Sequence, residues 1–122
     1  MRSSSSMLWR RMDVPGHDAC CLRQEADGWN LQGTAVFRHQ AGPAQIHYVV
    51  RCDSRWRTIF GRIHGFIGQI GLDHIIIRQS GLWKLNGVPV AGLGHLLDFD
   101  LGFTPATNLI QLRSELILGF RA

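Results

Sequence analysis

Gln45-Ile46-His47-Tyr48-Val49-Val50-Arg51-Cys52 is the stretch of sequence that decides the fold class. Apolar residues occupy every even position, and most odd positions carry polar or charged residues. Successive side chains of a β-strand point to opposite faces of the sheet, whereas a helix would repeat its apolar positions every three or four residues. The alternation therefore predicts a strand with one buried face.

Turn signals surround this strand at short intervals, which indicates an antiparallel meander. Ala26-Asp27-Gly28 and 39–43 are turns on its amino-terminal side, and Asn86-Gly87 is a strong hairpin signal because both residues tolerate the positive φ of a type I′ turn. Glycines inside the strand predicted at 55–67 suggest bends or bulges of a curved sheet at Gly61 and Gly65. The predicted fold class is mainly β, an antiparallel meander curled into a roll or barrel-like sheet. The other strands are expected at 19–25, 29–38, 72–78, 83–85 and 88–90.

The carboxyl-terminal part contains the single helix signal. Thr104 could cap a short helical turn that has Pro105 at its first position. Leucines at 109, 112 and 116 follow at helical spacing, but the apolar run at 116–118 fits a strand equally well. At most one short helical turn after Pro105 is therefore expected.

Two acidic residues stand out in the segment Leu97-Asp98-Phe99-Asp100-Leu101. In a strand, Asp98 and Asp100 would lie side by side on the face opposite the three apolar residues. Carboxylates accept hydrogen bonds from neighbouring sugar hydroxyls. Thr107 and Asn108, which follow closely, could do the same or could bond the nearby backbone.

Several motifs in a fixed order resemble a bacterial family of glycolipid-binding proteins. The resemblance runs from Met7 to about Arg113. It implies that residues 1–6 are a disordered extension and that 7–122 form a single β domain, the amino-terminal portion of a longer family domain. The stretches that carry it are Met7–Arg11, Pro15–Cys20, Gly28–Phe37, Tyr48–Asp53, Trp56–Thr58, Trp83–Val90 and Leu97–Leu109.

The resemblance implies a protein that binds an amphipathic ligand, possible examples being glycolipids, and does not transform it. Apolar strand faces would then line a cavity for the tail, with Asp98, Asp100, Thr107 and Asn108 near its mouth for the polar head. One or two tryptophans, Trp56 and Trp83 among the candidates, could line that cavity because an indole combines a large contact area with a hydrogen-bond donor.

Two other functions fit the same residues. Asp98 and Asp100 could be the paired acids of a hydrolase that cleaves a glycosidic or ester bond, because Cα atoms two residues apart in a strand are about 7 Å apart. Alternatively, the domain could be a protein-interaction module with no small ligand. Unpaired sheet edges would in either case allow self-association.

Composition limits the partners. The net charge of +4 comes from scattered residues, almost all arginine, so neither a nucleic-acid interface nor any other basic patch is indicated. No apolar run reaches the ~20 residues of a membrane-spanning helix. The six histidines and three cysteines lack metal-ligand spacing, and no cofactor motif is found. Three cysteines, two of them adjacent, do not suit a disulfide framework, so free thiols in the cytoplasm are expected: Cys20, Cys21 and Cys52.

Overall fold

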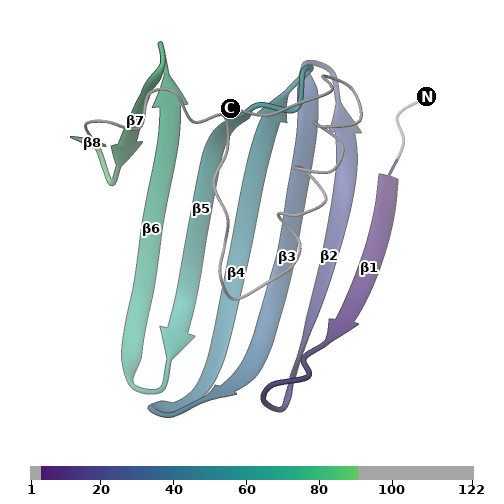
Figure 1. Cartoon of the computed structure of the whole chain (residues 1–122), viewed down its shortest axis with the longest axis vertical. Coiled ribbons are helices and arrows are strands. Elements are labelled where there is room, and N and C mark those ends of the chain that lie inside the picture. Colours follow the sequence, from purple (N-terminus) through teal and green to yellow (C-terminus); the bar gives the residue numbers. More distant parts are fainter. Residues whose placement is uncertain (1–3, 91–122) are drawn as a thin grey trace.

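The computed structural model describes residues 4–90, and these form one antiparallel sheet. Its eight strands lie in the order in which they occur in the sequence (Figure 1). The prediction of a mainly β meander is confirmed, whereas the helical turn after Pro105 lies outside the described residues. The strands are β1 Ser4–Arg10, β2 Gly16–Glu25, β3 Gly28–His39, β4 Gly42–Asp53, β5 Thr58–Ile67, β6 Ile70–Gln79, β7 Leu82–Leu85 and β8 Val88–Val90.

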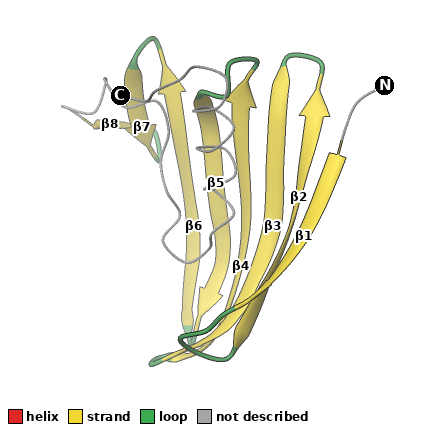
Figure 2. Ribbon diagram, turned by 45° about the vertical axis from the view of Figure 1, so that its right-hand side comes forward, coloured by secondary structure: helices red, strands yellow, loops and turns green. Residues whose placement is uncertain are grey.

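The sheet is curled, and within residues 4–90 it does not close into a barrel (Figure 2). β1 and β8 are the two edge strands of the described sheet, and each pairs with a single neighbour. Curling follows from the right-handed twist that accumulates over adjacent strands. Self-association through an exposed sheet edge stays a prediction.

The first strand corrects the prediction that residues 1–6 are a disordered extension. Ser4 to Ser6 belong to β1, and their partners in β2 are Arg23, Leu22 and Cys21. Backbone amides can pair whatever the side chains are, and the polar composition of a serine run does not reveal the neighbouring strand. Residues 1–3 lie outside the described part, and the single domain from 7 to 122 stays a prediction.

Strand β5 has no β-bulge at Gly61 or Gly65. Gly61 pairs with Val50 and Gly65 with Ile46 in regular register, while the irregularity lies at Arg51 and Cys52, opposite a β5 segment in which Ile59 has no partner. Gly65 is needed for another reason. Its φ is 145°, and a Cβ there would collide with the carbonyl oxygen of Gln45 on β4.

The hairpin between β7 and β8 has the predicted turn. Asn86 and Gly87 have φ values of 50° and 83°, both positive as a type I′ turn requires. The Asn86 side chain also anchors the turn to β6, since its Oδ1 accepts a hydrogen bond of 2.8 Å from the backbone amide of Ile75.

Replacing Gly87 with valine should lower the thermal midpoint of unfolding. A Cβ at this position meets no atom within 4 Å, so the cost is the positive φ alone, about 1 kcal/mol or more for a β-branched residue. Thermal unfolding followed by circular dichroism measures it. Gly87→Asn is the matched control, because asparagine tolerates positive φ, and equal midpoints for the two variants would contradict the turn.

One face of β2 to β4 is buried, and we call it the apolar face. Alternate residues point into it, which is the physical reason that the period of two was visible in the sequence. Leu31, Tyr48 and Val50 are almost completely buried there. Of the residues whose burial is described, its buried apolar side chains are Cys20, Leu22, Leu31, Ala35, Phe37, Ala44, Ile46, Tyr48, Val50 and Cys52.

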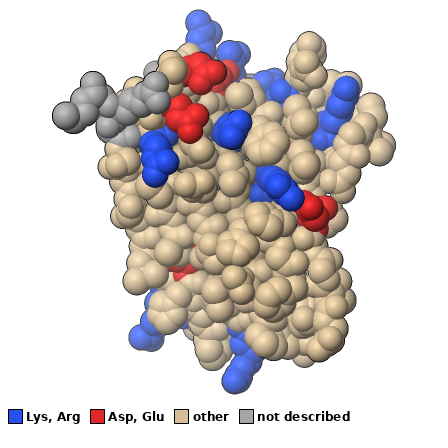
Figure 3. Space-filling view, turned by 180° about the vertical axis from the view of Figure 1, so that it is seen from behind, with Lys and Arg blue, Asp and Glu red and all other residues tan. Residues whose placement is uncertain are grey.

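The view from behind shows lysine and arginine side chains interspersed with acidic ones (Figure 3). Among the described residues, ion pairs join Arg62 to Asp73 at 3.0 Å and Arg57 to Asp53 at 2.8 Å. No continuous basic stripe of the kind that tracks a nucleic-acid backbone is visible on this face. Among the described residues, no helix could cross a membrane.

Candidate ligand-binding site

The acidic segment predicted from the sequence lies outside the described residues. This applies to Asp98 and Asp100 and equally to Thr107 and Asn108. Their role at the mouth of a ligand site therefore stays a prediction. The two tryptophans of the predicted site are described, and the structure places Trp56 in the turn between β4 and β5 and Trp83 on β7.

Trp56 is a core residue in the turn between β4 and β5. Only 3% of its surface is exposed, and its ring stacks on Trp29 with the centroids 4.1 Å apart. The turn is held by Asp53, whose Oδ1 accepts hydrogen bonds from the backbone amides of Arg55 and Arg57. One face of the Trp56 indole is thus occupied by Trp29, and Trp56 packs in the core. A role of Trp56 in ligand binding stays a prediction.

Trp83 is buried on β7, beside β6. It is 2% exposed, and the Arg78 guanidinium lies 5.9 Å from its ring centroid. Trp83 and Leu85 are two residues apart in a strand and therefore share a face. Leu85 in turn lines a small apolar cavity, described below, so Trp83 stands next to that cavity without lining it.

The apolar face contains one charged side chain, Asp18 on β2. It is 3% exposed, and its Oδ1 accepts a hydrogen bond of 2.6 Å from the Tyr48 hydroxyl. Its Oδ2 is buried and has no hydrogen-bond partner. Of the buried residues described, only Asp18 and Thr58 are polar or charged. Asp18 therefore places a hydrogen-bond acceptor, its unpartnered Oδ2 oxygen, among apolar side chains.

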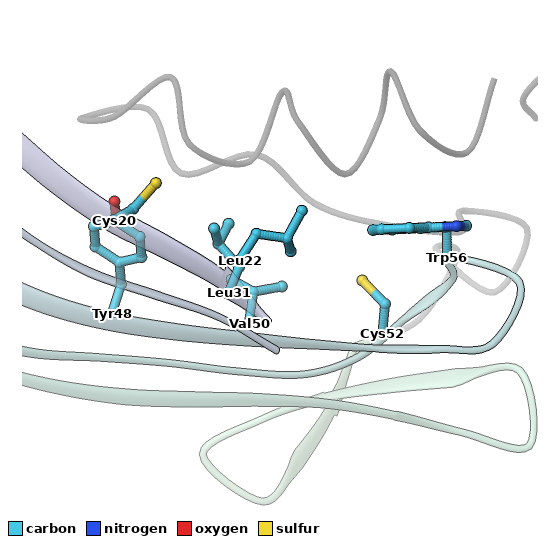
Figure 4. Packing of buried hydrophobic residues seen from close by; sticks show 7 residues of the cluster. All are labelled: Cys20, Leu22, Leu31, Tyr48, Val50, Cys52 and Trp56. Atoms are coloured by element: carbon cyan, nitrogen blue, oxygen red, sulfur yellow. The ribbon is translucent and has the colours of Figure 1, made fainter. Parts of the chain in front are cut away.

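Glycine 33 makes this bond possible. Tyr48 is on β4 and Asp18 on β2, so the tyrosine ring must cross β3 to reach the carboxylate. A Cβ at Gly33 would lie 2.6 Å from Cζ of Tyr48. The tyrosine ring therefore packs directly against the backbone of Gly33. Tyr48 and the other cluster residues labelled in Figure 4 project to the same side of the sheet.

Cys20, which lies beside the Asp18–Tyr48 pair, has a thiol of low reactivity. Burial, together with the negative charge of Asp18, raises the pKa of Cys20 to about 11. A thiol with so high a pKa forms little thiolate at neutral pH and is a poor nucleophile. Cys20, Cys21 and Cys52 are all free, as the sequence predicts.

Sequence reasoning missed Asp18 and Tyr48 as a pair. Asp18 precedes Cys20 and Leu22 at intervals of two, so an acid at an inward position could have been noticed. The strand prediction at 19–25 began one residue too late to include it, because β2 starts at Gly16. The partnership with Tyr48, thirty residues away, has no signal in the sequence.

A small apolar cavity lies further along the same face, on β5 to β7. Its volume is about 150 Å³, and Gly61 is one of its lining residues. Ile63, which lines it, is the register partner of Tyr48 and packs against the buried cluster. The cavity therefore begins on the strand next to Tyr48, whose ring crosses β3 toward Asp18 on β2. The lining residues are Gly61, Arg62, Ile63, His74, Ile76 and Leu85.

The opposite face has a shallow hollow of about 880 Å³. Its polar lining includes Thr34, His47 and His64. His47 Nδ1 lies 2.8 Å from Thr34 Oγ1, and His47 Nε2 lies 3.1 Å from Gln45 Nε2. His64 stacks loosely, with its ring centroid 5.1 Å from that of His47. Both ring nitrogens of His47 are engaged, and in the described part of the chain no three histidine, cysteine or acidic side chains could hold a metal ion.

Comparison with known proteins agrees with this architecture. A family model described as "Putative glycolipid-binding" matches residues 6–116. No curated protein matches the chain. A crystal structure of a DUF1089 family protein from Pseudomonas aeruginosa is similar in fold, with a TM-score of 0.68 and 23% sequence identity. The alignment covers 87% of this chain and 57% of that one, so the chain spans a little over half the length of the solved structure.

Proposed function

Because the chain belongs to the glycolipid-binding family, whose model matches residues 6–116, we propose that it binds an amphipathic glycolipid and does no chemistry on it. The observation that carries the proposal is the apolar face, a buried surface with Asp18 as its one charged side chain among the described residues. A ligand with an apolar tail and a hydroxyl-bearing head has the same combination of properties.

The tail would occupy the apolar side of the sheet at β5 to β7. There the cavity over Gly61 is lined by Ile63, Ile76 and Leu85, whose side chains are not fully buried. β2 and β5 are three strand spacings apart, about 14 Å. This separation suits a sugar ring at β2 joined through a linker to the first methylene groups of a tail at β5.

The headgroup would also meet the acidic segment. Asp98, Asp100, Thr107 and Asn108 are proposed as further hydrogen-bonding partners, on the basis of the residue types and the family resemblance. The three free thiols support a location in the cytoplasm. The raised pKa of Cys20 argues against this thiol as a nucleophile.

Native mass spectrometry of the purified chain tests the proposal. The protein should carry a co-purified species whose mass fits a glycolipid, and a delipidated sample should rebind it. A chain that neither carries nor binds any lipid would overturn the proposal. Turnover of a model glycoside would instead favour the hydrolase alternative.

Replacing Asp98 or Asp100 with asparagine should weaken glycolipid binding by about 1 to 3 kcal/mol, the usual value of a hydrogen bond to a charged group. The thermal midpoint should stay the same. Isothermal titration calorimetry and thermal unfolding measure the two effects. Asp73→Asn is the matched control, an exposed acid whose pKa is lowered by its hydrogen bond to Arg62. Unchanged affinity in both Asp98→Asn and Asp100→Asn would remove the acidic segment from the site.

A further inference from the structure

We propose that Asp18 accepts a hydrogen bond from a hydroxyl of the bound headgroup, so that the site selects uncharged, hydroxyl-rich heads over phosphate heads. This inference rests on the proposed function and assigns the chemistry of its head site. The starting observation is the Oδ2 oxygen of Asp18, which is buried and unpartnered although Oδ1 is bonded to Tyr48. More than nine buried polar groups in ten have a partner in folded proteins, so such an oxygen calls for a donor.

Arg11, a basic group whose pKa Asp18 raises, is not a hydrogen-bond partner of the Asp18 Oδ2 oxygen. The pKa of Arg11 is raised mainly by its hydrogen bond to Asp13. The negative charge of Asp18 also raises it, with a smaller effect. Two hydrogen bonds of 3.0 and 2.8 Å join Arg11 to Asp13. The guanidinium also lies over the Phe37 ring, 4.5 Å from its centroid. Arg11 is thus already neutralised by another acid.

The surroundings of Asp18 suit a sugar ring. Its register partner on β3 is Ala35, and Gly33 is two residues away, so the neighbouring strand presents small groups beside the carboxylate. On the other side its partner is Trp9 of β1, a partly buried indole that packs against the core cluster. A flat apolar ring beside a carboxylate can pack against the C–H face of a sugar while the acid accepts from its hydroxyls.

The same geometry disfavours anionic heads. A carboxylate is an acceptor, and a phosphate group also presents acceptor oxygens and negative charge, so the two repel each other. The repulsion is strong at a buried site, where the effective dielectric constant is far below that of water. Hydroxyl groups, in contrast, donate to Asp18 with no added charge.

Binding of two lipids with the same acyl chains tests this selection. The probes are monogalactosyl diacylglycerol and phosphatidic acid in mixed detergent micelles, with free galactose as a third arm. The wild type should bind the galactolipid about 10- to 100-fold more tightly than phosphatidic acid, the range expected for a hydrogen bond to a charged group. Asp18→Asn should remove that preference, because the amide nitrogen is a donor and the charge is gone. Asp73→Asn, on the exposed Arg62 pair, should keep the preference.

A second variant separates recognition from folding. Tyr48→Phe leaves the carboxylate in place and frees Oδ1 as well, so it should keep the preference for the galactolipid even if its stability falls. Asp18→Asn should unfold at the same temperature as the wild type or higher, since a buried charge with an unpaired oxygen is removed. A lower midpoint together with an equal loss of both lipids would show a structural role for Asp18 and overturn the inference.

The remaining outcomes are distinguishable. Equal affinity of the wild type for both lipids, or a preference that survives Asp18→Asn, overturns the head assignment and leaves the proposed function standing. Failure of the wild type to bind either lipid overturns the proposed function and the inference with it. Free galactose that binds as tightly as the galactolipid would support the role of Asp18 and contradict the tail site.

Discussion

Gly33→Ala is expected to lower the free energy of unfolding by about 2 to 4 kcal/mol, the sum of overpacking and the weakened Tyr48–Asp18 hydrogen bond. The new Cβ would lie 2.6 Å from Cζ of Tyr48 and 2.5 Å from the carbonyl oxygen of Ala19. The ring can move, but the backbone oxygen belongs to a paired strand and cannot. Urea unfolding followed by tryptophan fluorescence measures the loss.

Glycine 71 provides the matched control. It is also in a strand, and a Cβ there meets no atom within 4 Å, so Gly71→Ala should change stability little. A double-mutant cycle with Tyr48→Phe isolates the contact between the new Cβ and the Tyr48 hydroxyl, because phenylalanine keeps the ring and lacks the hydroxyl that reaches Asp18. Additive effects of Gly33→Ala and Tyr48→Phe would mean that the Tyr48 hydroxyl does not lie against Gly33.

Leu31→Ala should lower the free energy of unfolding by about 2 to 5 kcal/mol, the usual range for truncating a fully buried leucine. Leu31 is completely buried on β3, in the cluster that also contains Leu22, Val50 and Trp56. Truncation removes its contacts and leaves a cavity that surrounding strands cannot fill, because their spacing is set by backbone hydrogen bonds. Chemical unfolding with a constant m-value would measure the difference.

The same substitution at Leu8 is the control. Leu8 lies on β1 and is 71% exposed, so Leu8→Ala removes no core contact and should cost less than 1 kcal/mol or so, as for most surface changes. Similar losses at Leu8 and Leu31 would contradict the placement of Leu31 in the core. If neither substitution changes the free energy of unfolding, burial of the apolar face of β3 does not stabilise the sheet.

The candidate site was only partly predictable. The sequence pointed to Asp98 and Asp100 because two acids alternate with apolar residues over a short local stretch. Asp18 is a single acid, and its significance depends on burial and on Tyr48, thirty residues later. Trp56 and Trp83 were recognised as large amphipathic residues, but the stacking of Trp56 on Trp29 depends on the turn after β4. Contacts between distant residues have no local signal.

Local chemistry determined most of the strand order. Alternation at 45–52, the turn at 26–28 and the hairpin at Asn86-Gly87 each depend on neighbouring residues, and all three are found in the structure. The sequence also determined the free thiols, through the number and adjacency of the cysteines. These features follow from side-chain alternation and from the φ preferences of glycine and asparagine, which act within a few residues.

Tertiary structure alone decided the features that require pairing or burial. Ser4 to Ser6 form a strand because they pair with the edge of β2, and the register irregularity at Arg51 and Cys52 depends on the pairing of β4 with β5. Gly33 is essential because a tyrosine from the next strand crosses it, and Asp18 acquires an unpartnered oxygen because the sheet buries it. A side chain's desolvation and partners are set by the whole fold, which is why the carboxylate proposed for the head site emerged from the structure.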